Sequence, residues 1–246
     1  MKLPISKSII ALALLMGWTA QAGISYGTFA NSGNIPDGSS SGSAGTATAS
    51  GFLPTISDIS VKLNISGGFN GDLYAYLSYG GVLVPLLNRV GVTTTGGGDA
   101  FGYGETGFNV TLSSAGAQDV HFYGNYSPTI NGSGQLTGTW QPDGRAIDPQ
   151  SAPSSFDSAS RVSFGSYSGL NPNGTWTLFI ADLSAGGGQS QLVSWELDIT
   201  AVPEPVHVAL GVFAGVLLFG SLVRSRLVRK RVRSWRVAVV QWIDAV

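Results

Sequence analysis

Two stretches near the end of the chain alternate between apolar and polar residues with a period of two. Within residues 173–182, Trp176, Leu178 and Ile180 fall on one face, and polar residues fall mostly on the other. Within residues 192–200 the alternating apolar positions are Val193, Trp195, Leu197 and Ile199. Successive side chains of a strand point to opposite faces, so both stretches are predicted strands with one buried face. The expected core anchors are Trp176, Leu178, Trp195 and Leu197.

The same alternation recurs earlier in the chain. Ile59, Val61, Leu63 and Ile65 share one face of a predicted strand, and Leu73, Ala75 and Leu77 share one face of another. Further strands are predicted at residues 82–87, 108–112 and 120–123, and Pro85 indicates an edge strand or a bulge. With no helical periodicity before residue 206, this spacing predicts an all-β fold, an antiparallel β-sandwich of the jelly-roll kind.

Two segments lack this pattern. Residues 23–50 hold many Gly, Ser and Ala; we expect a first edge strand around Ile24–Phe29 and a flexible stretch around Asp37–Ala47. Residues 141–149 contain Asp143-Gly and Asp148-Pro turn signals. They predict a long surface loop packed by Trp140. A structural connection is favoured there over a binding loop.

A family resemblance rests on the order of these motifs. Gly71-Asp72-Leu73 is followed by Gly174, Trp176, Leu178 and Asp182, then by a glycine-rich loop, and finally by Leu192, Trp195, Leu197 and Ile199. Over residues 50–201 this order resembles the P domain (P/Homo B domain), the β-sandwich module that follows the catalytic domain in subtilisin-like proprotein convertases. The family's usual His before Gly-Asp-Leu and its Ser-Pro-x-Gly-Thr after it are absent.

The first 22 residues have the features of a secretory signal. Lys2 and Lys7 precede the apolar run 9–16, and Ala20-Gln-Ala22 is a cleavage site of the A-x-A type. The apolar run is too short to span a bilayer. Export through the Sec translocon and cleavage by signal peptidase are therefore predicted, with the mature chain beginning at Gly23.

The carboxyl end carries a second targeting pattern. The apolar run Val206–Val223 contains no Asp, Glu, Lys or Arg and as a helix spans about 27 Å, enough for a bilayer core. It follows Pro203-Glu204-Pro205. Basic residues follow it, among them Arg224, Arg226, Arg229 and Arg231. The positive charges predict a cytoplasmic end.

This end resembles the PEP-CTERM sorting signal of Gram-negative bacteria. The resemblance implies an exosortase-type transpeptidase that recognises Pro203-Glu204-Pro205 and transfers or releases the ectodomain. The alternative is a plain membrane anchor. The chain continues through residues 237–246, which the resemblance does not cover.

The predicted domains are a signal peptide at 1–22, the edge strand and Gly/Ser-rich segment at 23–50, the sandwich at 51–201 and the sorting signal at 202–246. The near-neutral net charge of −1 is the sum of two segments with opposite charge. Acidic residues dominate the ectodomain, and basic residues dominate the tail. An acidic exterior repels phosphates, so nucleic acid is not an expected partner.

No catalytic constellation is visible in the sequence. A nucleophilic triad needs a His between a Ser and an acid, and the two histidines are His121, expected on the wetter face of a strand, and His207 in the apolar run. The chain has no Cys, which excludes disulfides and thiolate metal sites. We therefore expect no enzyme.

Calcium is the one cofactor considered, with Asp72 and Asp182 as its ligands. Hard cations bind carboxylate and carbonyl oxygens on flexible loops. Asp72 follows a glycine at a predicted strand start, and Asp182 ends a predicted strand before a glycine-rich loop. No D-x-D-x-D pattern is present. This favours the alternative, in which each Asp caps a turn and no cofactor is bound.

The sequence thus predicts a non-catalytic module with a structural or adhesive role. It would be held at the inner membrane during sorting and then reach the cell surface or the extracellular matrix. One alternative is an accessory P domain linked to a serine-type endopeptidase of the subtilisin kind. Another is a carbohydrate-binding module, with extracellular polysaccharide as the partner. The aromatic residues considered for stacking on sugars are Tyr74, Tyr76, Tyr79, Tyr103, Tyr123 and Tyr126.

Overall fold

The computed structural model describes residues 21–26, 28–29, 33–204 and 209–226. The chain divides into two units. One is the compact body Ala20–Val202, and the other contains the residues before and after it. Nearly all of the predicted signal peptide, together with Pro205, His207, Arg229 and Arg231, lies outside the described residues.

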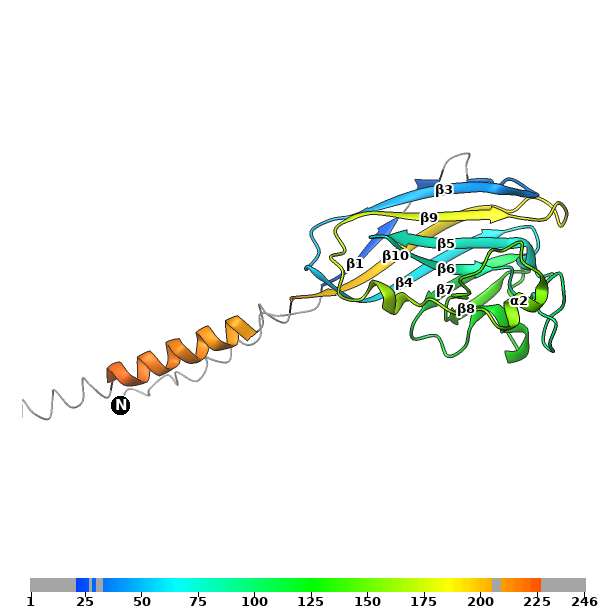
Figure 1. Ribbon diagram of the computed structural model, residues 1–246. Helices are drawn as coiled ribbons and strands as arrows, with labels where there is room; N and C mark the ends of the chain where they lie inside the picture. The colour runs from blue at the N-terminus through cyan, green and yellow to red at the C-terminus, as the bar shows by residue number, and fades with distance from the viewer. Residues whose placement is uncertain (1–20, 27, 30–32, 205–208, 227–246) are drawn as a thin grey trace, which may run out of the picture. The chain divides into compact units, whose positions relative to one another are not determined.

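The body is a sandwich of two five-stranded sheets (Figure 1). The first sheet has the order β1 (Gln21–Tyr26), β10 (Gln191–Val202), β4 (Thr55–Ser66), β7 (Gly107–Ser113), β8 (Leu136–Trp140). The second has the order β2 (Thr28–Phe29), β3 (Ser39–Ala49), β9 (Gly174–Asp182), β5 (Leu73–Tyr79), β6 (Val82–Asn88). All neighbouring strands are antiparallel except β7 and β8. The predicted all-β antiparallel sandwich is confirmed.

One hydrophobic core lies between the sheets. Trp176 is fully buried and Trp195 is 2% exposed, and Leu178 and Leu197 are fully buried beside them. The predicted inward residues of β4 and β5 also lie in this core. The period-two pattern therefore identified the buried faces of the central strands correctly.

Strand β10 departs from the simple alternation at its start. A register shift between Leu192 and Ser194 marks a β-bulge, which reverses the faces of the preceding residues. Leu192 is buried, whereas Val193 is 55% exposed. The assignment of Val193 to the buried face was wrong for this reason.

The Gly/Ser-rich segment at Asp37–Ala47 was expected to be flexible, but most of it forms β3. This strand pairs with β9 from Ser39 opposite Asp182 to Ala49 opposite Gly174. Its inward residues Ala47 and Ala49 are small and buried. The single edge strand expected around Ile24–Phe29 is divided into β1 and β2, which lie at the edges of two different sheets.

The segment Val120–Tyr126 is a 3₁₀ helix and not the predicted strand. Asp119 caps its start by accepting the His121 backbone N–H at 2.6 Å. His121 is fully buried, which corrects its expected place on a wet face. A short helix α2 (Pro153–Asp157) also interrupts the β pattern.

The turn-rich segment 141–149 runs along the free edge of β6. The backbone N–H groups of Asp143 and Gly144 donate to the carbonyls of Leu86 and Pro85, at 3.1 and 2.9 Å. Strand β6 is the last of its sheet and carries a register irregularity at the position opposite Pro85, as that proline predicted. The segment is thus a structural connection that covers an exposed edge.

In the second unit, the described residues Ala209–Arg226 form a helix that is long and apolar enough to cross a membrane, judged by length and composition. Its mean hydropathy is 1.4. The helix includes Arg224 and Arg226 at its end. It begins and ends three residues later than the predicted span 206–223, although residues 205–208 lie outside the described part.

Candidate functional site

Three acidic residues meet the ends of three neighbouring strands in the second sheet. Asp182 is the last residue of β9, Asp72 immediately precedes β5, and Asp37 lies two residues before β3. Since β9 runs antiparallel to both neighbours, its end lies beside the starts of β3 and β5. Asp182 is the register partner of both Ser39 and Leu73. Asp72 and Asp182 are thus brought together, as a shared role would require.

Asp182 is fully buried and only half satisfied. Its Oδ2 accepts a hydrogen bond from the Ser190 hydroxyl at 2.6 Å, and Ser190 is itself fully buried. Its Oδ1 is buried and has no hydrogen-bond partner among the described residues. Burial raises the pKa of Asp182, the Ser190 hydrogen bond lowers it in part, the charge of Asp37 raises it again, and the Ser184 backbone N–H lowers it slightly.

Asp72 is 8% exposed and belongs to the 3₁₀ helix Asn70–Asp72. Its backbone carbonyl accepts the Leu183 N–H at 2.9 Å, which fixes it beside the end of β9. Burial and the nearby Asp182 carboxylate raise the pKa of Asp72 to about 6, although Arg89 opposes the shift. Within the described residues no hydrogen bond reaches its carboxylate.

Glycines allow the surrounding loops to approach closely. Gly68 has φ +65°, and a Cβ there would lie 1.9 Å from the Ser190 hydroxyl oxygen and 3.3 Å from Asp182 Oδ2. The backbone of this loop therefore passes directly over the Asp182–Ser190 pair. Only glycine combines that closeness with that backbone angle.

We call Asp72, Asp182, Ser190 and Gly68 the carboxylate end of the sandwich. Its chemistry suits a hard cation, because it offers carboxylate oxygens that lack donors. Over the described part of the chain, no group of three His, Cys, Asp or Glu side chains has the geometry of a metal site. An ion here would complete its shell with backbone carbonyls and water. Sequence reasoning found the two aspartates but missed Asp37 and Ser190, which carry no motif of their own.

A second polar cluster is buried under the 141–149 segment. His121 Nδ1 lies 2.6 Å from Asp143 Oδ2, and its Nε2 lies 3.0 Å from the Val92 carbonyl oxygen. Arg145 Nη1 donates to Asp143 Oδ1 at 3.2 Å and to Asp119 Oδ2 at 3.0 Å. Burial raises the pKa of Asp143, but His121 and Arg145 outweigh burial and lower it.

This cluster ties separate segments of the fold together. The Val92 carbonyl can only accept, so Nε2 of His121 donates to it. Nδ1 lies against one oxygen of the Asp143 carboxylate, and Arg145 donates to the other. Among the described residues, these groups and not a Ser or Thr hydroxyl are the partners of the two ring nitrogens.

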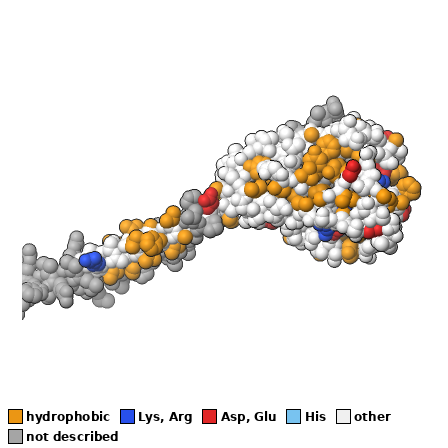
Figure 2. All heavy atoms as spheres, in the orientation of Figure 1, with side chains coloured by type: hydrophobic (Ala, Val, Ile, Leu, Met, Phe, Trp, Pro, Cys, Tyr) orange, Lys and Arg blue, Asp and Glu red, His pale blue; other side chains and the backbone are white. Residues whose placement is uncertain are grey.

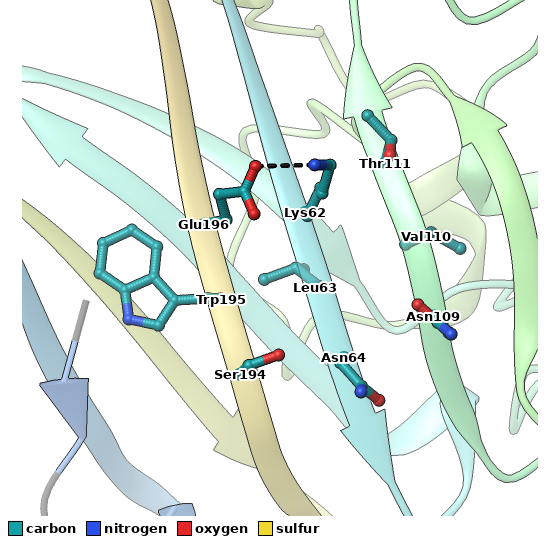
Figure 3. A pocket seen from close by; sticks show the side chains of 9 residues that line it. All are labelled: Lys62, Leu63, Asn64, Asn109, Val110, Thr111, Ser194, Trp195 and Glu196. Atoms are coloured by element: carbon teal, nitrogen blue, oxygen red, sulfur yellow. Dashed lines mark hydrogen bonds and ion pairs between the residues drawn. The ribbon is translucent and has the colours of Figure 1, made fainter. Parts of the chain in front are cut away.

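A small hollow of about 170 Å³ lies over β10, β4 and β7 of the first sheet (Figure 3). Across it, Lys62 Nζ donates to Glu196 Oε1 at 2.7 Å. Asn64 Oδ1 accepts from Gln135 Nε2 at 2.9 Å. These groups satisfy one another, so the hollow presents no free charge to a ligand.

The tyrosines considered for sugar binding lie in different surroundings. Tyr123 is fully buried, Tyr79 is half-buried with one ring face stacked on Trp176, and Tyr103 is half-buried against Tyr123. Tyr126, at the end of the 3₁₀ helix Val120–Tyr126, is 46% exposed. Tyr74 and Tyr76 lie half-buried on the outer face of β5. There Tyr76 stacks on Phe179 of β9 with 4.9 Å between ring centroids. Hydrophobic side chains gather over this part of the sandwich in Figure 2.

We call Tyr74, Tyr76 and Phe179 the aromatic face. Tyr74 completes it at centroid distances of 5.8 Å from Tyr76 and 6.3 Å from Phe179. Leu83, which is 41% exposed, lies on β6, the strand next to β5. The sequence could not separate this set from the buried tyrosines, because Tyr74, Tyr76 and Tyr79 lie on one strand and Tyr123 lies in a segment with a strand-like pattern that forms a 3₁₀ helix.

No protein-family model matches this chain, and none of the curated proteins does. Among solved structures it is similar to a crystal structure of a serine protease of Aeromonas sobria, at 12% identity and a TM-score of 0.38, over 74% of this chain and 27% of that one. A structure of that protease in complex with a chaperone matches at 13% identity and the same TM-score, over 78% and 29%.

This chain spans less than a third of the length of either neighbour. A likeness at this level carries no argument about activity. The sandwich is shown by the strands themselves, and the P-domain resemblance stays a prediction from the sequence motifs.

Proposed function

We propose that this protein is an exported, non-catalytic β-sandwich module that a PEP-CTERM-type signal delivers to the cell surface. Pro203-Glu204-Pro205 would be recognised by an exosortase-type transpeptidase while the apolar helix holds the precursor in the inner membrane. The ectodomain would then act in the envelope or the extracellular matrix in a structural or adhesive role.

The observation that carries this proposal is the position of the domain boundary. The compact body ends at Val202, whose strand partner is Thr55, and the Pro-Glu-Pro motif begins with the next residue. Proline lacks a backbone N–H, so the motif cannot extend the β10 ladder. A cut there would leave every strand of the sandwich intact.

The second support is the charge pattern at the far end. Arg224 and Arg226 close the described helix, and further basic residues follow in the sequence. Moving arginine across the hydrocarbon is costly, so this end should stay in the cytoplasm. The acidic body would then face the outside.

The test is the mass of the mature protein, isolated from the surface fraction of a host that has an exosortase. The expected product begins at Gly23 and lacks Arg224–Arg236. A variant with Pro203, Glu204 and Pro205 replaced by alanine should remain full length in the inner membrane. The matched control is Asp58→Ala, which removes an exposed acid on β4 and should be sorted like the parent.

Two outcomes would contradict the proposal. A surface product that keeps Arg224–Arg236 would make this end a plain anchor. Normal processing of the alanine variant would mean that the enzyme does not recognise the Pro-Glu-Pro motif.

A second candidate, carbohydrate binding, is favoured by the aromatic face. Flat aromatic rings on a sheet surface can stack on sugar rings, and an apolar patch of this kind often marks a binding surface. Tyr76→Ala and Phe179→Ala should abolish retention of the protein in gels that contain a bound polysaccharide. Phe101→Ala, at a loop residue that is 78% exposed, is the control. Equal retention of all three variants would remove this candidate.

A further inference from the structure

The carboxylate end of the sandwich poses a problem of charge. Asp72 and Asp182 are both buried, the charge of Asp182 acts on Asp72, and Asp37 adds a third negative charge that acts on both. Within the described part of the chain, the cation that acts on Asp72 is Arg89, whose Nε donates to the Gly71 carbonyl at 3.3 Å. Asp182 gains no cationic partner from the described residues.

The second problem is the unpaired Oδ1 of Asp182. Asp182 Oδ1 is buried without a partner, while Oδ2 is held in place by Ser190. An unpaired buried carboxylate oxygen costs the full loss of its hydration unless something replaces water. The Ser190 hydrogen bond fixes the orientation of the group, so Oδ1 is held ready for that replacement.

We propose that the carboxylate end binds one Ca²⁺ ion between Asp72 and Asp182. A divalent cation would cancel the repulsion of the two carboxylates and would satisfy Oδ1 at once. Ca²⁺ fits better than Mg²⁺ because it accepts six to eight oxygens in flexible geometry, including backbone carbonyls and water. The glycine-rich loops that close over this end bring backbone within reach.

The expected affinity is modest. Two carboxylates supply fewer charges than a high-affinity site does, and extracellular modules bind calcium with Kd values on the order of 10⁻⁴–10⁻³ M. Such a site would be filled in a calcium-rich exterior and would be empty in a chelator. The inference goes beyond the proposed sorting function and does not depend on it.

The experiment is calcium titration of the full chain, purified in detergent, by isothermal titration calorimetry and by thermal melting. The wild-type protein should bind about one Ca²⁺. At a calcium concentration about ten times Kd, the melting temperature should rise by about 3–6 °C over that in EGTA, because the ion binds only the folded state. Magnesium at the same concentration should produce a smaller rise.

Asp182→Asn and Asp72→Asn should each lose both the binding heat and the calcium-dependent rise in melting temperature. The control Asp58→Asn should keep both, because Asp58 is exposed and lies on β4, in the other sheet. If Asp182→Asn does not fold, as judged by near-ultraviolet circular dichroism, Asp72→Asn carries the test alone, since its carboxylate makes no hydrogen bond that the fold depends on.

A melting temperature that stays unchanged from EGTA to about 10 mM calcium, with no binding heat, would overturn the proposal. So would an undiminished calcium effect in both Asn variants, which would place the ion elsewhere.

Discussion

The indole of Trp176 lies flat against the ring of Tyr79, with 4.0 Å between their centroids and 9° between their planes. The polar atoms of both rings donate hydrogen bonds to the same loop. Tyr79 Oη donates to the Asn171 carbonyl at 2.6 Å, and Trp176 Nε1 donates to the Pro172 carbonyl at 3.0 Å. The pair therefore ties the loop that precedes β9 to the end of β5.

Trp176→Ala should lower the free energy of unfolding by about 3–5 kcal/mol, because it removes a fully buried indole and leaves a cavity between the sheets. Urea unfolding followed by circular dichroism measures this. Phe101→Ala, in which the lost ring is 78% exposed, should change stability by less than about 0.5 kcal/mol. A similar effect of the two changes would show that Trp176 is not a core anchor.

Asp143→Asn should destabilise the protein by about 3–5 kcal/mol, since it leaves the buried His121 and Arg145 without their shared counter-ion. Asp58→Asn, an exposed acid, should be close to neutral. Urea midpoints at pH 7 compare the two. A near-neutral Asp143→Asn would mean that the fold does not depend on the Asp143 carboxylate as the partner of His121 and Arg145.

The same pair predicts acid sensitivity. The folded state lowers the pKa of Asp143, so its contribution to stability is complete above the unfolded pKa of about 3.8 and is lost as the pH falls through the lower folded value. At pH values below about 4, the urea concentration at the unfolding midpoint of the wild-type protein should therefore fall. The midpoint of Asp143→Asn should fall less over the same pH range. Parallel curves for the two proteins would contradict this.

Asp72 predicts that, in the absence of calcium, stability changes with pH in the opposite direction. Its pKa is about 6 in the folded state against 3.8 for the free side chain, so between these values the folded protein binds more protons than the unfolded one. Stability in EGTA should fall as the pH rises from about 4 to 7, by at most about 3 kcal/mol at roughly 1.4 kcal/mol per pKa unit. Asp72→Asn should flatten the curve, and an unchanged slope in that variant would refute the assignment.

Gly68→Ala tests the close approach over Asp182 and Ser190. The new Cβ would collide with the Ser190 hydroxyl at 1.9 Å, in addition to the strain of a positive φ. The matched control is Gly51→Ala, where φ is +76° and no atom lies within 4 Å. Gly51→Ala should cost about 1 kcal/mol and Gly68→Ala should cost clearly more. Equal costs would mean that the loop can move away from the carboxylate.

The buried faces of the sandwich could be predicted because strand periodicity is a local property. Trp176, Leu178 and Leu197 follow the pattern without interruption, and all three are buried. Val193 failed because a bulge needs a partner strand, which the local sequence does not reveal. The strand β3 was missed because its pairing with β9 holds small residues in place that have little strand tendency alone.

The candidate site could be predicted only in part for the same reason. Asp72 and Asp182 each stood beside a glycine motif, but their proximity comes from the order of strands in the second sheet. Ser190 and Asp37 join them from loops that carry no recognisable signal. His121 was placed on a wet strand because the network that buries it is supplied by Asp143 and Arg145, more than twenty positions further along the chain.

Strand β10 has a mechanical consequence for a protein held by its carboxyl end. It lies between β1 and β4, and the two ladders run along it as far as Ala201 and Val202. A pull directed along this strand from Val202 would load hydrogen bonds to two neighbours at once. A sandwich tethered in this way would bear tension through a strand that is paired on both edges.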